Sequence, residues 1–342
     1  MKQFFNLLIL ALLLAMPASG FSQEADKADD ADCSIPKELR APLKGPPPEI
    51  KVGVFFVDVQ TINDKKQTFT CNAIFQFSWK DPRLSEQSLG RSLEQCNLAL
   101  DEIWHPDIIT VNMVKGDDYG EKATVDKQGN VVFTERLRNA EFFFDLEFLD
   151  FPFDTQVLHI IFGTGDEITL AFDSESTGIR KKLSVDGWDI TLTEPVITSE
   201  QIESHESIAR LDFRLLAKRH PGYYLWKVIL PLCLIVLMAW SVFWIDPSQI
   251  GPQLGLSTAT VFTLIAYRFT LGFFLPPVAY FTRMDTFVLL ATFLVFLALG
   301  LAITTSRLAS KDRKALAVKI ERTARVVYLV IFVFIIVYSF LM

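Results

Sequence analysis

Four apolar segments dominate the hydropathy pattern of the last third of the chain. They cover residues 223–245, about 250–275, about 285–305 and 326–342. A helix rises about 1.5 Å per residue, so about 20 residues cross a hydrocarbon layer roughly 30 Å thick. The first three segments exceed that length and the fourth just reaches it. We therefore predict a transmembrane domain over residues 221–342 that contains four helices.

A different pattern, alternation of apolar and polar residues, runs through residues 49–220. Every second residue from Phe69 to Trp79 is apolar, and shorter alternating stretches recur at residues 142–149, 188–193 and 211–216. A period of two is typical of half-buried strands. Turn sequences such as Asp126–Asn130 and Asp186-Gly187 separate the stretches. Many short strands predict an immunoglobulin-like antiparallel β-sandwich, followed in the chain by the four-helix bundle.

The N-terminal segment reads as a targeting sequence. Residues 1–20 combine Lys2, an apolar run from Leu7 to Met16 and small residues at 18–20, as a signal peptide does. The alternative is a true membrane helix, but the apolar run is short for one. Residues 21–48 are acidic and then proline-rich, which predicts a poorly ordered leader.

Charge divides the chain in the same way as hydropathy. Residues 21–220 carry a net charge of −14, and residues 221–342 a net charge of +6. This split excludes a simple soluble enzyme, a disordered chain and a nucleic-acid-binding protein. Basic residues concentrate at 305–325, between the third and fourth apolar segments. The positive-inside rule places this segment, predicted as a loop, in the cytoplasm, so the N-terminal domain and the C-terminus lie outside.

Enzyme chemistry is missing from the sequence. It has no nucleophile elbow, phosphate-binding loop or zinc motif, and its four histidines are scattered. We therefore expect no catalytic residue, metal or cofactor. Of the four cysteines, Cys71 has the parity of the apolar face of its strand and is expected to be a buried free thiol. Whether Cys33 or Cys96 forms a disulfide stays open.

Five short motifs carry a resemblance. In chain order they are Asn72 through Leu84 with Trp79 inside, Trp104–Asp107, Phe151–Gln156, Arg219–Tyr223 and Pro231. Each is weak alone, but five in this order before four apolar segments are specific. Over residues 49–342 the chain resembles the pentameric ligand-gated ion channels of the Cys-loop receptor superfamily.

The departures from that superfamily are informative. Phe144 and Leu158 occupy the positions of the two loop cysteines, and the connection between the third and fourth segments is short. Both features are similar to the bacterial members. The resemblance implies a homopentamer, with four identical subunits as partners of the chain. It also implies a multi-pass protein of the bacterial inner membrane.

The resemblance places an agonist site between subunits. The matching positions are Ile74, Val111, Gly165 and Asp166, together with a hairpin at about residues 196–208. That hairpin has no aromatic residue, which argues against an aromatic cage for a quaternary amine. It holds Glu200, Glu203, His205 and Glu206. The hairpin is either an ordinary solvated loop or a sensor of pH or cations, so the agonist is an unidentified small molecule or protons.

The second segment would line the pore. The family's pore face corresponds to one helical stripe of Gly255, Ala259, Phe262, Ala266, Phe269 and Phe273. Five Phe262 rings would form a hydrophobic gate that closes by dewetting. Two alternatives stay open: a rotated helix that presents its threonine stripe, or phenylalanines that serve only helix packing.

Ion selectivity is open between cations and anions. The mouth sequence Gly251-Pro252-Gln253 has no acid and has a proline, as anion channels do. The acidic outer domain should concentrate cations, and we expect a cation channel. The alternatives are an anion channel of the same family and a membrane-anchored sensor or adhesion protein that conducts nothing.

The resemblance also implies a coupling junction between the two halves. It contains the loop residues Phe151, Pro152, Phe153 and Asp154, the pre-helix Arg219, and the linker prolines Pro276 and Pro277. The opposite charges of Asp154 and Arg219 predict a partly buried ion pair. The alternative is that Arg219 only anchors the membrane interface.

Overall fold

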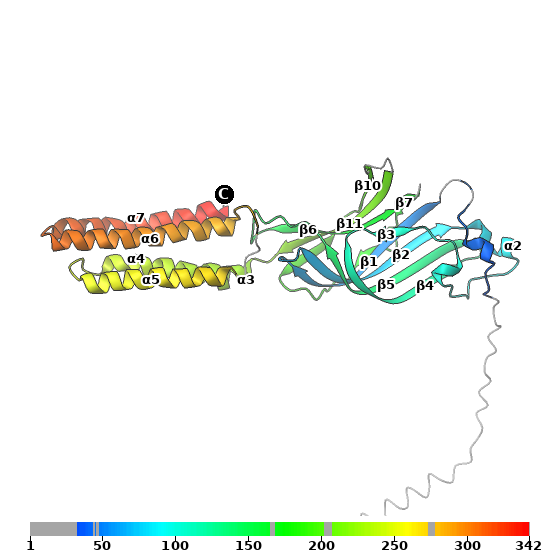
Figure 1. Cartoon of the computed structure of the whole chain (residues 1–342), viewed down its shortest axis with the longest axis horizontal. Helices are drawn as coiled ribbons and strands as arrows, with labels where there is room; N and C mark the ends of the chain where they lie inside the picture. The colour runs from blue at the N-terminus through cyan, green and yellow to red at the C-terminus, as the bar shows by residue number, and fades with distance from the viewer. Residues whose placement is uncertain are drawn as a thin grey trace, which may run out of the picture. The chain divides into compact units, whose positions relative to one another are not determined.

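The computed structural model describes residues 33–43, 45, 48–164, 168–201, 207–272 and 278–341. The signal peptide and most of the leader fall outside these residues. The described chain contains a β-sandwich followed by four long helices (Figure 1). The two predicted halves of the fold are therefore confirmed.

In the described part of the chain, eleven strands form the two sheets of the sandwich. One sheet has the order β4-β5-β2-β1-β7, with β8 also paired to β1. The other has the order β10-β11-β6-β3, with β9 also paired to β11. Most pairings are antiparallel, but β1 pairs in parallel with β7 and β8. The bounds are β1 Glu49–Asn63, β2 Thr68–Lys80, β3 Ile108–Thr110, β4 Met113–Val125, β5 Asn130–Phe143, β6 Thr155–Thr164, β7 Thr169–Phe172, β8 Gly178–Ile179, β9 Trp188–Leu192, β10 Val196–Gln201 and β11 Ser207–Arg219.

The apolar residues that alternate along β2 form part of the sandwich core, as predicted. Phe69, Cys71 and Phe75 are fully buried, and the Phe75 ring meets Phe162 of the opposite sheet edge-on at 4.9 Å. Cys71 is a free, buried thiol, and burial raises its pKa. Cys33 and Cys96 are disulfide-bonded, which the sequence left open.

One alternating stretch was wrongly predicted as a continuous strand. β5 ends at Phe143, and the chain from Phe144 to Asp154 leaves the sheet. The apolar residues of this segment have another use, because Phe148 and Phe151 pack into the hydrophobic core of the helices. The period of two cannot distinguish a strand from a loop that inserts apolar side chains into a second core.

Among the described residues, four helices are long and apolar enough to cross a membrane, as predicted. They run over Gly222–Trp244, Ile250–Leu271 (α5), Arg283–Ser310 (α6) and Lys314–Leu341 (α7), and the first contains α3 (Gly222–Tyr224) and α4 (Leu230–Ser241). α6 begins with a capping box, in which Thr282 Oγ1 accepts a bond from the Asp285 amide and Asp285 accepts one from the Thr282 amide.

The basic segment 305–325 is not a loop, which corrects that prediction. α6 continues to Ser310 and α7 starts at Lys314, so only three residues connect the two helices. The segment is rich in Ala, Lys and Arg, which are good helix formers, so the helices extend beyond their apolar stretches.

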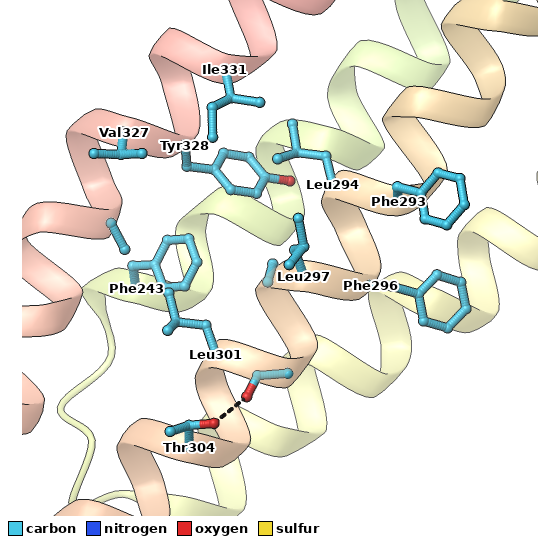
Figure 2. Close-up of a pocket in the computed structure, with 13 residues that line it drawn as sticks. Phe243, Phe293, Leu294, Phe296, Leu297, Leu301, Thr304, Val327, Tyr328 and Ile331 are labelled. Carbon is cyan, nitrogen blue, oxygen red and sulfur yellow. Dashed lines mark hydrogen bonds between the residues drawn. The ribbon is translucent and has the colours of Figure 1, made fainter.

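Hydrogen bonds and rings join the helices. Tyr328 of α7 donates to the Val236 carbonyl of α4, and the Trp240 indole donates to the Arg325 carbonyl. A cavity of about 520 Å³ lies beside Tyr328, where Figure 2 shows the rings of Phe243 and Tyr328 close together. Its lining is almost entirely apolar. The hydroxyls of Thr304 and Tyr328 both donate to main-chain carbonyls.

We expect Gly129→Ala to destabilise the sandwich more than Gly187→Ala. Both glycines have φ near +81°, but an added Cβ at Gly129 would lie 2.4 Å from the Asp81 carbonyl oxygen, whereas nothing lies within 4 Å at Gly187. The positive φ alone costs roughly 1–2 kcal/mol, and the clash adds to it. Thermal unfolding of both purified variants measures the difference. Equal unfolding midpoints would contradict the predicted clash.

Candidate functional site

Arg219 occupies a buried position between the sandwich and the first long helix. It is the last residue of β11, and its side chain is 4% exposed. Its Nε donates to Asp154 Oδ1 at 2.8 Å, and a terminal nitrogen donates to Asp154 Oδ2 at 3.1 Å. The two terminal nitrogens also donate to both carboxylate oxygens of Asp64, at 2.8 and 3.0 Å. The structure thus contains the predicted Asp154–Arg219 ion pair and adds a second carboxylate to it.

Aromatic rings surround the guanidinium. Its central carbon lies 4.1 Å from the centre of the Trp188 ring and 5.0 Å from that of Phe151. The Tyr224 hydroxyl accepts a longer bond at 3.4 Å. Burial alone lowers the pKa of Arg219, but the hydrogen bonds and charges of Asp64 and Asp154 outweigh it and raise the pKa above its usual value. Rings and carboxylates together compensate the desolvated charge.

The Arg219 cluster, meaning Arg219 with Asp154 and Asp64, draws on three parts of the sequence. Asp154 precedes β6, and Asp64 lies in the turn between β1 and β2. Asp64 was not predicted from the sequence, because Asn63–Lys66 looks like an ordinary polar turn. The one available signal was that a buried guanidinium with five donors needs more than one carboxylate.

The loop from Phe144 to Asp154 contacts the helices directly. The Tyr280 hydroxyl accepts a bond from the Phe148 amide at 2.9 Å, and the Arg283 amide donates to the Leu149 carbonyl at 3.1 Å. Arg283 Nε also pairs with Asp150 at 2.7 Å. The Phe153 ring meets Phe340, near the end of α7, at 5.8 Å. Pro152 lies within this loop, whereas Pro276 and Pro277 fall outside the described residues.

The predicted pore stripe lies on the face of α5 that is free within the subunit. Gly255, Ala259, Phe262, Ala266 and Phe269 are all exposed, with Phe262 at 67% and Phe269 at 75%. The opposite face packs into the bundle through Ser257, Thr260 and Leu264. Phe273 lies outside the described residues.

The alternative threonine stripe is divided between two environments. Thr260 is buried, and the Tyr267 hydroxyl donates to the Val228 carbonyl of the first helix. Thr263 and Thr270 are exposed, but their hydroxyls donate to carbonyls of their own helix. Part of this stripe therefore belongs to the bundle.

The described part of the implied agonist site is not gathered into one pocket. Ile74 lies on β2 and is half-buried, whereas Val111 follows β3 in the other sheet and is 41% exposed. Gly165, Asp166, Glu203, His205 and Glu206 lie outside the described residues, as does the side chain of Glu200 in β10. The pH-sensing hypothesis for the hairpin therefore remains a prediction.

The structure reveals an acidic cavity that the sequence analysis missed. It measures about 190 Å³ and lies between the sheets, with a lining that includes Glu121, Glu135, His105, Asp107 and the aromatic residues Phe77, Trp79 and Phe133. Glu135 has the same parity as the buried Phe133 and Leu137, so it occupies an inward-facing position of β5. An acid at an inward-facing position of the strand was the available sequence signal.

Negative charges crowd Glu135. Glu121 lies directly opposite it across the β4–β5 pair, and Asp118 is close by on β4. Burial, followed by the charges of Asp118 and Glu121, raises the pKa of Glu135 to about 7. Burial and a hydrogen bond with Asp118 also raise the pKa of Glu121. Glu135 therefore changes charge near neutral pH.

Comparison with known proteins agrees with this architecture. A family described as the neurotransmitter-gated ion-channel ligand binding domain matches residues 37–221, more than half of the chain. The chain belongs to the pentameric ligand-gated ion channels. A proton-gated ion channel of Gloeobacter violaceus is 27% identical over 297 residues, which cover 85% of this chain and 82% of the relative.

Family membership confirms the predicted class of protein. The chain is an ion-channel subunit and a multi-pass membrane protein, and its family consists of channels and not enzymes. The matched domain coincides with the β-sandwich. Phe144 and Leu158, which the resemblance places at the family's loop cysteines, are buried at 2% and 0% exposure. Apolar packing therefore occupies the place of a covalent link.

We expect Arg219→Met to destabilise the protein strongly, because it leaves Asp154 and Asp64 facing each other without a cation. Removing one partner of a buried ion pair typically costs about 3–5 kcal/mol. Asp64→Asn should cost less, since Asp154 keeps the guanidinium paired. Thermal unfolding in detergent, monitored by tryptophan fluorescence, shows which of the two variants is less stable.

Lys127→Met is the matched control, because it breaks the exposed Lys127–Glu94 pair, which spans 3.8 Å. Such pairs contribute roughly 0–1 kcal/mol. If Arg219→Met unfolds at the same temperature as Lys127→Met, the Arg219 cluster does not stabilise the junction.

Proposed function

We propose that the chain forms a homopentameric, proton-gated and cation-selective channel whose pore is lined by α5. The observation that carries the proposal is the free face of α5. Five residues of the family's pore face are exposed within the subunit, while the opposite side of the helix packs into its own bundle through Ser257, Thr260 and Leu264. Around a five-fold axis this face would surround a lumen, and its large side chain at Phe262 would narrow it.

The membrane orientation is part of the proposal. The sandwich and the C-terminus lie outside, and residues 305–325 lie in the cytoplasm. Seven basic residues against two acids at the α6–α7 turn support this orientation. In a bacterium the membrane would be the inner membrane.

Protons are the proposed agonist. The relative named as a proton-gated ion channel supports this choice, and Glu135 provides a group that titrates near neutral pH. At neutral pH the acidic cavity holds partly charged Glu135 against Glu121 and Asp118. Acidification neutralises Glu135 and removes this repulsion. A conformation that binds the proton more tightly is thereby favoured.

The proposed cation selectivity is based on the negative electrostatic field of the outer domain. Residues 21–220 carry a net charge of −14, which should concentrate cations above the pore. The mouth residues Gly251 and Pro252 add no charge. Selectivity would then depend on the outer domain, and it should weaken at high salt, which screens exposed charges.

Purified protein in planar bilayers tests the proposal as a whole. A step from pH 8 to pH 5 on the sandwich side should open channels, and a tenfold KCl gradient should displace the reversal potential toward the potassium equilibrium potential. Displacement toward the chloride potential would favour the anion-selective alternative. Absence of any current from assembled pentamers would favour the non-conducting sensor.

We expect Phe262→Ala to open the channel at higher pH or to leave it leaking at pH 8. Removing five rings widens the constriction and lowers the cost of wetting it. Single-channel recording measures the open probability. Val261→Ala is the matched control, because Val261 is buried on the neighbouring face of α5. Unchanged currents in Phe262→Ala would show that this ring does not face the pore.

We expect Glu135→Gln to open with less acid and with a shallower pH dependence, because it imitates the protonated side chain at every pH. The raised pKa of Glu135 also determines how the stability of the folded protein depends on pH. Wild-type stability falls as pH rises from 4.5 through about 7, since the folded state resists ionisation of Glu135. Glu135→Gln should therefore unfold at a higher temperature than wild type at pH 8, but not at pH 4.

Glu94→Gln provides the control, since this carboxylate is half exposed and outside the acidic cavity. Its activation curve should coincide with that of wild type. If Glu135→Gln also leaves the activation midpoint and the pH 8 unfolding temperature unchanged, Glu135 is not the proton sensor.

The Arg219 cluster is proposed to couple the sandwich to the pore. Its loop contacts Tyr280 and Arg283 at the start of α6, which directly follows the α5–α6 linker. Asp150→Asn, which weakens the Arg283 contact, should shift activation to lower pH. Its partner variant Arg283→Gln should produce the same shift, and the double variant should add little. Strictly additive effects would exclude coupling through this pair.

A further inference from the structure

Three buried polar side chains meet at the beginning of the pore helix. Gln253 lies in the first turn of α5 and is fully buried, Glu321 of α7 is 1% exposed, and Ser306 of α6 is 3% exposed. Gln253 Nε2 donates to Glu321 Oε1 at 2.6 Å, and Ser306 Oγ donates to Gln253 Oε1 at 2.5 Å. Both polar atoms of one amide are thus used to join three helices. We call these residues the Gln253 cluster.

The cluster is also tied to the backbone of α5. Ser257, one turn further along, donates its hydroxyl to the Gln253 carbonyl at 2.9 Å. Side chain and main chain of Gln253 are therefore both held, which fixes the rotation of the first turn. Gly255, the first residue of the proposed pore stripe, is only two residues away.

The bond from Gln253 to Glu321 has no substitute between these helices. α7 packs mainly against α6, and among the described residues it is the one hydrogen bond between α5 and α7. Glu321 is 1% exposed, and a carboxylate buried so fully is costly unless hydrogen bonds satisfy it. Helix packing alone could have been served by an apolar side chain at position 321.

Charged groups around Glu321 are engaged elsewhere. Arg325, one turn along α7, donates through Nε to the Phe243 carbonyl and lies over the Trp244 ring at 4.3 Å. Asp246 pairs with Lys314 at 3.1 Å. Thr305 of α6 also hydrogen-bonds to Glu321, and Gln253 is the partner of Glu321 on the pore helix.

We propose that Glu321 is a positioning residue for the pore, and that it acts through Gln253 to set the rotation and radius of α5 at its first turn. The inference rests on the proposed pore-lining role of α5. A movement of α7 relative to α6 would be transmitted through the Gln253 cluster to the pore mouth. In this way α7, which presents no residue to the pore stripe, takes part in determining conductance.

A reciprocal exchange of side chains tests the proposal. Gln253→Glu alone places two carboxylates at 2.6 Å, and their repulsion should displace the first turn of α5. We expect it to change the unitary conductance and to shift the open–closed equilibrium by roughly 2- to 30-fold. Adding Glu321→Gln restores every bond with donor and acceptor exchanged: Gln at 321 donates to Glu at 253, and Ser306 still donates to it. The double variant should return to the wild-type conductance.

Further variants keep the test decisive if the single exchange does not assemble. Ser306→Ala removes one donor without adding charge and should change the unitary conductance in the same direction as Glu321→Ala. Thr292→Val is the control, since it removes a buried hydroxyl of α6 that bonds only within its own helix. It should leave conductance unchanged.

The outcomes separate the two levels of inference. If wild type conducts, pentamers of Gln253→Glu, Glu321→Ala and Ser306→Ala assemble, and all have wild-type unitary conductance, the Gln253 cluster is merely structural and the proposal is overturned. Failure of the double exchange to restore conductance overturns it as well. If wild type conducts nothing, or Phe262→Ala leaves the current unchanged, the proposed pore itself fails.

Discussion

A single buried guanidinium determines how the two halves of this channel can be joined. Arg219 ends the last strand of the sandwich three residues before the first helix, and its side chain is removed from water. A charge in that position must be compensated, so Asp154 and Asp64 have to approach it from two other parts of the chain. Satisfying one side chain thus fixes the end of β11, the start of β6 and the β1–β2 turn relative to one another.

The same constraint explains the fate of the loop between β5 and β6. Once Asp154 is held by Arg219, the preceding residues cannot continue the strand of β5. Phe148 and Phe151 then bury their rings among the side chains of the helices. The loop has no disulfide at its base, because Phe144 and Leu158 stand there. The ion pair at its end and the apolar packing along it hold the loop in place, as a disulfide would otherwise do.

The sequence predicted most of the fold for clear physical reasons. Long apolar segments have few alternatives to membrane helices, and the alternation in β2 has few alternatives to a half-buried strand. The Asp154–Arg219 pair followed from the family motifs. Asp64 and Glu135 did not, because their significance depends on what lies opposite them. A turn aspartate and an inward-facing glutamate look ordinary until the cross-strand neighbours are known.

The ends of the helices could not be predicted from the hydropathy pattern either. Hydropathy indicates which part of a helix can lie inside a bilayer. The helix itself can continue beyond that part, for as long as its residues favour a helical conformation. For that reason α6 and α7 extend through residues predicted as a loop. Side-chain partners of buried polar residues are similarly invisible, since Gln253, Ser306 and Glu321 are far apart in the chain.

The two ends of the segment around α5 are held by different kinds of interaction. Beyond its C-terminal end, the start of α6 is bonded to the sandwich loop through Tyr280 and Arg283, partly at exposed positions. At its N-terminal end, Gln253 is held by buried bonds to two helices. Buried polar bonds are expensive to break, whereas exposed pairs exchange with water at little cost. We therefore expect motion to enter at the junction and to be resisted at the Gln253 cluster, so that α5 tilts about its first turn when the sandwich changes shape.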